Sequence, residues 1–149
     1  MIIVLDTGPL GLVTNPKLSE PAVKCSNWLQ GQLGAGVRVA IPEIADYELR
    51  RELIRANKKK GLIKLDALTE VLEYLPITTL AMRQAAIYWA MARQQGKPTA
   101  KDNTIDGDMI LAAQVHALGD PTAVIATTNV GHLGRFTSAS CWHEIPIQD

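Results

Sequence analysis

Long apolar runs are missing from this 149-residue chain. No stretch of about 18 apolar residues occurs, so no membrane-spanning helix is expected. The first residues also lack a basic region followed by an apolar stretch and a small-residue cleavage site, so no secretory signal is expected. Only two cysteines are present, Cys25 and Cys141, and they lie far apart without metal-ligand spacing. Together these absences predict a cytoplasmic protein with reduced thiols.

Net charge is absent as well, because 15 basic residues balance 15 acidic ones. The chain as a whole is therefore not an electrostatic binder of nucleic acid, although a local basic patch is not excluded by this balance. Histidine is scarce, and His116, His132 and His143 share no spacing, which favours ordinary surface or core residues over catalytic bases. The 47% of hydrophobic residues suffices for a core, and the length predicts one domain over residues 1–149.

Short apolar runs alternate with helical patterns along the chain. Continuous apolar runs bounded by turn residues are typical of buried strands, and they occur at 2–5, 37–41 and 122–128. Shorter edge strands are expected at 75–78 and 142–147, and loops at 14–17 and 102–108. The alternation predicts an α/β fold with a mainly parallel sheet. Helices are expected at 19–33, 42–57, 62–74, 81–95 and 109–118.

Polar side chains fall where ligands bind in such a fold, beyond the carboxyl ends of the strands. Asp6 ends the first strand, and Glu48 lies about two turns into the helix after the second. Asp106 and Asp108 precede the fourth strand, and Asn129 follows it. A set of oxygen ligands without His or Cys suits a hard divalent cation such as magnesium or manganese. Because close carboxylates repel one another, such a cluster is costly to keep for structure alone.

Each of these residues also has a purely structural interpretation. Asp6 could start a turn or cap the segment that follows, and Asp106 could be a helix N-cap. Asp108 could be a first-turn acid favoured by the helix dipole, Glu48 a solvated surface residue, and Asn129 a turn residue. The joint placement of the residues, and no single one of them, favours a metal site.

Four pieces of the sequence, in this order, resemble the PIN-domain nucleases and most of all their VapC-like toxin branch. The resemblance implies a three-layer α/β/α sandwich and a magnesium- or manganese-dependent endoribonuclease that leaves a 5′-phosphate on its RNA product. It also implies a homodimer and a neighbouring antitoxin that inhibits the enzyme. The four pieces are Val4-Leu5-Asp6-Thr7-Gly8, Glu48-Leu49, Asp108-Met109-Ile110-Leu111-Ala112-Ala113 and Thr127-Thr128-Asn129.

Carried over to this chain, the resemblance assigns Asp6, Glu48 and Asp108 as catalytic, metal-binding acids. The fourth family position is commonly Asp, whereas this chain has the neutral Asn129, which can ligate through its carbonyl. Asp106 is the candidate for the missing charge. The departure leaves an alternative open, in which the fold binds RNA or a protein and its metal site is weakened or inactive.

The basic helix end and the Ala- and Met-rich helix could each be either a binding surface or an ordinary part of the fold. Arg50, Arg51 and Arg55, with the lysines that follow, could track RNA phosphates, or they could be a solvated helix end. The Ala- and Met-rich helix at 81–95 could pack against a second subunit, or it could be a core helix.

Overall fold

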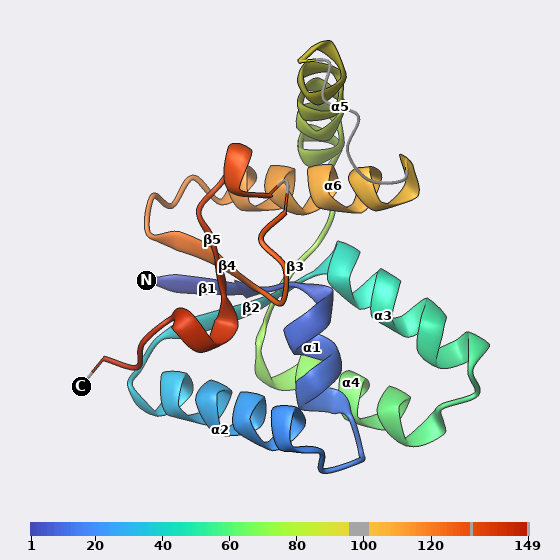
Figure 1. Ribbon diagram of the computed structural model, residues 1–149, viewed down its shortest axis with the longest axis vertical. Helices are drawn as coiled ribbons and strands as arrows, with labels where there is room; N and C mark the ends of the chain where they lie inside the picture. Colours follow the sequence, from blue (N-terminus) through green and yellow to red (C-terminus); the bar gives the residue numbers. More distant parts are fainter. Residues whose placement is uncertain (96–101, 132, 149) are drawn as a thin grey trace.

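A computed structural model describes residues 1–95, 102–131 and 133–148, and for residues 102–105 the backbone alone. Within these residues the strands form one sheet in the order β3-β2-β1-β4-β5, and every neighbouring pair is parallel (Figure 1). The predicted α/β class with a parallel sheet is confirmed. The strands are β1 (Ile2–Leu5), β2 (Arg38–Pro42), β3 (Glu73–Leu75), β4 (Ala123–Thr127) and β5 (Ala139–Cys141).

Helices cover both faces of the sheet, which gives the three layers that the resemblance implied (Figure 1). Ile3 and Leu5 of β1 pack with residues of α1 (Thr7–Thr14), α2 (Glu20–Gly34) and α4 (Lys59–Val71). Ile2 and Val4 point to the opposite face, where they pack with residues of α6 (Asp102–Leu118). Helix α5 (Thr79–Gln94) packs on the outside of α6, and α3 (Glu43–Arg55) directly follows β2.

The first helix, α1, covers Thr7–Thr14, where the sequence predicted the end of a strand and no helix. Asp6 is its N-cap, and the Leu10 N–H donates to the Asp6 carbonyl over 3.1 Å. Gly8 and Pro9 predicted the end of a strand, and both lie in the first turn of α1. The N–H groups of a first turn have no hydrogen-bond partner within the helix, so the missing N–H of a proline costs nothing there. Strand β1 therefore passes directly into α1, and Asp6 lies at the junction.

Two further predictions are wrong. The polar segment 102–108 is part of α6, whose residues from Met109 onward pack on the sheet and on α5, and acids are favoured near a helix N-terminus. The last strand is not 142–147 but β5, followed by a 3₁₀ turn, η2 (Trp142–Glu144). The small residues of β5 pair with β4 in the register Ile125↔Ala139 to Thr127↔Cys141.

The remaining elements agree with the prediction to within a few residues. Ser19 caps α2 as expected, with its hydroxyl accepting from the Ala22 N–H. Strand β3 lies at the sheet edge as predicted, although it covers Glu73–Leu75 instead of 75–78. No helix in the described part of the chain is both long and apolar enough to cross a membrane.

The strand order places β1 in the centre, with β2 on one side and β4 on the other. The chain leaves β1 towards β2, and the β4 connection runs to the opposite side, so the ends of β1 and β4 form a topological switch point. The Asp6 N–H donates to the Ala126 carbonyl over 2.9 Å, which sets Asp6 beside the end of β4. The fold thus predicts a ligand site at Asp6.

Candidate metal centre

Asp6 is held in place by groups from two elements. Its Oδ1 accepts from the Thr7 N–H at the start of α1 over 2.7 Å, and its Oδ2 accepts from the Thr127 hydroxyl at the end of β4 over 2.7 Å. Burial raises the pKa of Asp6 above its ordinary value of 3.8, although these two hydrogen bonds lower it. Asp6 is therefore a helix cap, as one interpretation had it, and its half-buried carboxylate also accepts a hydrogen bond from a second strand.

Glu48 of α3 reaches the same place through Thr7. The Thr7 hydroxyl donates to Glu48 Oε1 over 3.0 Å, while the Thr7 N–H contacts Asp6, so one residue orients both acids. Burial raises the pKa of Glu48 and the charge of Asp6 adds to this, against the Thr7 hydrogen bond and the charge of Arg51. Glu48 is half-buried and close to a second carboxylate, which a solvated surface acid would not be.

Gly107 of α6 lies against the other side of the Glu48 carboxylate. A methyl group built on Gly107 would come within 2.7 Å of Glu48 Oε2, so a side chain at this position would displace the carboxylate. Glu48 is therefore held between the start of α1 and the second turn of α6. This contact also brings α6 and the following residue, Asp108, to the centre.

Asp108 completes the group of acids. Its pKa is raised to about 6, first by burial and then by the negative charges of Asp6 and Glu48. Three carboxylates from β1, α3 and α6 thus share one electrostatic environment. Burial raises the pKa values of all three acids, and repulsion from a neighbouring carboxylate adds to this at Glu48 and Asp108, so without a cation the charge is relieved by binding protons.

The donor chemistry of this centre fits a hard divalent cation. Asp6, Glu48 and Asp108 offer carboxylate oxygens, and Thr7 and Thr127 orient two of them through hydrogen bonds. Mg²⁺ keeps several water ligands and needs only a few carboxylates. A divalent charge would also reverse the repulsion that raises these pKa values.

Two contributors to this centre were missed in the sequence. Thr127 belonged to a matched piece of the chain, but a strand-end threonine carries no sign that its hydroxyl faces Asp6. Gly107 lay in a segment predicted as a loop, where a glycine needs no special reason. Only the structure shows that α3 approaches α6 so closely that a side chain at Gly107 would collide with the Glu48 carboxylate.

Asp106 and Asn129 lie differently from the three acids. Asp106 is exposed and lines a hollow between α5 and α6 together with Met82 and Trp89. Residues two apart on a helix point about 200° apart, so Asp106 and Asp108 face different sides of α6. Asn129 lies just past β4, where its backbone N–H donates to the Thr127 hydroxyl over 3.1 Å. Ligation by Asp106 or Asn129 stays a prediction.

The three arginines have different surroundings. Arg50 bridges Asp46, at 3.0 Å, and Asp66, at 2.7 Å, and thereby ties α3 to α4. Arg55 pairs with Glu52 at 2.8 Å. The Arg51 guanidinium lies over the Tyr47 ring, 5.1 Å from its centroid. Its positive charge lowers the pKa of Glu48, so Arg51 acts electrostatically on one of the three acids.

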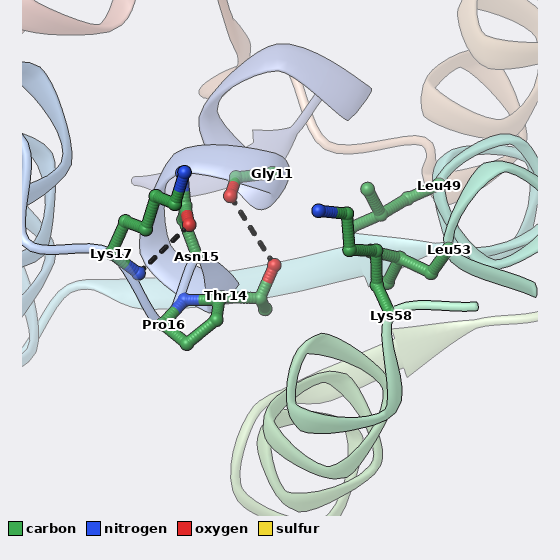
Figure 2. Close-up of a pocket in the computed structure, with 8 residues that line it drawn as sticks. All are labelled: Gly11, Thr14, Asn15, Pro16, Lys17, Leu49, Leu53 and Lys58. Atoms are coloured by element: carbon green, nitrogen blue, oxygen red, sulfur yellow. Dashed lines mark hydrogen bonds between the residues drawn. The ribbon is translucent and has the colours of Figure 1, made fainter. Parts of the chain in front are cut away.

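A pocket of about 360 Å³ lies beside the acidic centre, between α1 and α3 (Figure 2). Leu49 and Leu53 of α3 form an apolar wall opposite Gly11 and Thr14 of α1, and the flanking cations are those of Lys17 and Lys58. Leu49 follows Glu48 directly, so the pocket and Glu48 share helix α3. The lining residues are Gly11, Thr14, Asn15, Pro16, Lys17, Leu49, Leu53 and Lys58.

No family model and no curated protein matches this sequence. Solved structures do match its fold. A chain of VapBC2 from Rickettsia felis, bound to a promoter DNA fragment, superimposes with a TM-score of 0.73 and 21% identity, over 95% of this chain and 99% of that one. A chain of FitAcB from Neisseria gonorrhoeae superimposes with a TM-score of 0.67 and 20% identity, over 96% and 99%.

A chain of DNA-bound VapBC from Salmonella typhimurium also superimposes, with a TM-score of 0.67 and 20% identity, over 95% of this chain and 98% of that one. Identities this low establish a shared fold. The shared fold is consistent with the PIN-like architecture that the sequence resemblance implied.

Proposed function

We propose that this protein is a magnesium- or manganese-dependent endoribonuclease and the toxin of a toxin–antitoxin pair. The observation that carries the proposal is the convergence of Asp6, Glu48 and Asp108: burial, together with the charges of Asp6 and Glu48, raises the pKa of Asp108 to about 6. A site with this donor chemistry, at the switch point of a parallel sheet, is suited to a hard cation and a phosphodiester.

The proposed reaction is hydrolysis of an RNA phosphodiester bond, which leaves a 5′-phosphate. The cation, when bound, supplies positive charge that acidifies a water molecule and stabilises the charge developing on the phosphate. The chain's own part is to hold the acids: Thr127 and Thr7 fix Asp6, and the Thr7 hydroxyl fixes Glu48. Arg51, whose field reaches Glu48, is the arginine best placed to attract an RNA phosphate.

The direct test is cleavage of an end-labelled RNA by purified protein as Mg²⁺ or Mn²⁺ is added. We expect cleavage that depends on the cation and is lost in Asp6→Asn and Asp108→Asn. The matched control is Glu20→Gln, because Glu20 is an exposed acid of α2 that pairs with Lys24 in an i,i+4 bridge. An inactive wild type that still binds RNA would support the alternative of a binding module instead.

The proposed partner is an antitoxin peptide that enters the pocket between α1 and α3. Leu49 and Leu53 offer an apolar wall and Lys17 and Lys58 offer cations, which suits a segment with apolar and acidic side chains. Co-expression with the product of a neighbouring reading frame tests this idea. We expect a stable complex with the wild type, and weaker binding to Leu53→Asp at unchanged cleavage activity.

A homodimer is proposed through the outer face of α5. This helix packs on α6 and leaves Leu80, Met82 and Ile87 exposed, and Met82 also lines the hollow with Trp89 and Met109. Apolar side chains gathered on an outer helix are typical of subunit interfaces. Light scattering should give a dimer for the wild type and a monomer for Met82→Glu, whereas a monomeric wild type would refute the proposal.

A further inference from the structure

The side chains of Cys141, His143 and Glu144 come together at the end of β5, away from the proposed nuclease acids. One ligand atom from each, a thiol sulfur, an imidazole nitrogen and a carboxylate oxygen, lies within 4.8 Å of the other two. In the described part of the chain, these three side chains form a group of His, Cys, Asp or Glu residues close enough together to hold a metal ion. We propose that it is a zinc site with three protein ligands and one open position.

The backbone turn explains why these residues converge. In an extended strand, Glu144 would point to the face opposite Cys141 and His143. Here β5 ends at Cys141, and the next three residues form η2, a 3₁₀ turn. A 3₁₀ turn has about three residues per turn, so Cys141 and Glu144 lie one above the other. The 3₁₀ turn thus creates a site that a strand prediction could not show.

The turn is anchored on both sides, so its geometry does not depend on a metal ion. Cys141 is paired with Thr127 in the parallel register of β4 and β5. After the turn, the Ile145 carbonyl accepts from Trp28 Nε1 over 2.9 Å and from Gln32 Nε2 over 3.3 Å. The Trp142 ring packs edge-on against Trp28 at 5.7 Å. A pre-formed turn loses little freedom when a metal binds, and this favours affinity.

The ligand set selects the metal. Sulfur, imidazole nitrogen and carboxylate oxygen are the ligands of Zn²⁺, with bonds of about 2.0–2.3 Å, which place neighbouring ligand atoms roughly 3.3–3.8 Å apart. A closure of about 1 Å by side-chain rotation therefore brings three atoms now within 4.8 Å into a tetrahedron. A thiolate does not suit Mg²⁺, so we expect zinc at the Cys141 site and Mg²⁺ at the carboxylate centre.

The site is open to solvent, because His143 and Glu144 are exposed and Cys141 is half-buried. Zinc can thus enter without unfolding, and its fourth position holds a water molecule. The reaction is balanced by one proton: the Cys141 thiol loses its proton to solvent as the sulfur–zinc bond forms. Affinity should therefore increase with pH.

The test is titration of the reduced, metal-free full chain with Co²⁺, a spectroscopic substitute for zinc, in the absence of oxygen. We expect a thiolate-to-cobalt charge-transfer band that saturates at one equivalent and disappears when Zn²⁺ is added. Cys141→Ser should abolish the band, and His143→Ala should weaken binding at least tenfold. The measurement requires no nuclease activity, so its result is independent of the function proposed above.

Two controls separate this site from the other thiol and from the acids. Cys25→Ala should keep the band, because Cys25 is fully buried and burial raises the pKa of its thiol to about 12. Asp108→Asn should also keep it, since a carboxylate centre produces no thiolate band. Absence of the band in the wild type, or its persistence in Cys141→Ser, overturns the proposal. Circular dichroism of each variant excludes misfolding as the cause of a loss.

Discussion

The Thr127 hydroxyl donates a 2.7 Å hydrogen bond to Oδ2 of Asp6, across 121 positions of sequence. The bond joins the ends of β4 and β1, the two strands at the switch point of the sheet. The same hydroxyl also lies 3.1 Å from the Asn129 carbonyl. Its single proton is best given to Asp6, because that bond is shorter and its acceptor is charged.

Thr127→Val should loosen Asp6 and weaken divalent-cation binding. The hydrogen bond lowers the pKa of Asp6, so its loss raises this pKa further and disfavours the charged form that a cation needs. We expect a loss of about 1–3 kcal/mol in the free energy of unfolding. Urea unfolding and Mg²⁺ calorimetry measure the two effects. Thr127→Ser keeps the hydroxyl and should recover most of the affinity, and equal losses in both variants would contradict the prediction.

Gly107→Ala should change stability and metal affinity in opposite directions. Alanine favours a helix interior by up to about 1 kcal/mol over glycine, so α6 itself gains. The new methyl group would lie 2.7 Å from Glu48 Oε2, so the carboxylate has to move and cation affinity should fall about tenfold. Gly34→Ala in α2 is the control, because its methyl group meets no atom within 4 Å. Unchanged affinity in Gly107→Ala would contradict the contact.

The metal-free protein should lose stability as pH rises from about 4 to 7. The pKa of Asp108 in the folded protein is about 6, against an ordinary value of 3.8, so the folded state holds this proton more tightly. The stabilisation is complete below about pH 4 and is lost as pH rises through 6. For a partly buried carboxyl we expect a loss of about 1 kcal/mol, allowing for solvent screening.

Urea unfolding over this pH range, with Asp108→Asn as the comparison, checks the prediction. The variant should show a smaller loss, because only Asp6 and Glu48, whose pKa values are also raised, still contribute. Cation binding requires charged carboxylates, so Mg²⁺ affinity should fall below pH 6. A wild type whose stability rises over this range would contradict the shared environment of the acids.

Arg51→Ala and Arg50→Ala should have different consequences. The charge of Arg51 acts on Glu48, so the loss of Arg51 should weaken RNA binding. The slope of log affinity against log salt concentration should also decrease by about one. Arg50 bridges Asp46 and Asp66, so its loss should destabilise the fold by about 1–3 kcal/mol. Filter binding at several salt concentrations and thermal unfolding measure the two effects. If the dependence of RNA affinity on salt concentration is unchanged in Arg51→Ala, Arg51 does not contact the RNA.

Much of the fold could be predicted from local pattern. The apolar run of β1, bounded by Asp6, and the alternation with helices indicate a parallel sheet because each element carries its own periodicity. The failures share one cause. The structure of segments 7–14, 102–108 and 142–144 depends on partners elsewhere in the chain: the packing of α1 on α2, the packing of α6, and the anchoring of η2 by Trp28.

For the candidate site, residue type and order gave Asp6, Glu48, Asp106, Asp108 and Asn129 as candidates, because hard-cation chemistry restricts the usable side chains, and the family resemblance singled out Asp6, Glu48 and Asp108. Their spatial relationships depend on distances that no pattern encodes. Tertiary structure alone brings Thr127 to Asp6 and Gly107 to Glu48, directs Asp106 to the α5 side of α6, and gathers Cys141, His143 and Glu144 in one turn. The sequence determines which side chains are available for chemistry. Which of them lie close together is decided only when the strands pair and the helices pack.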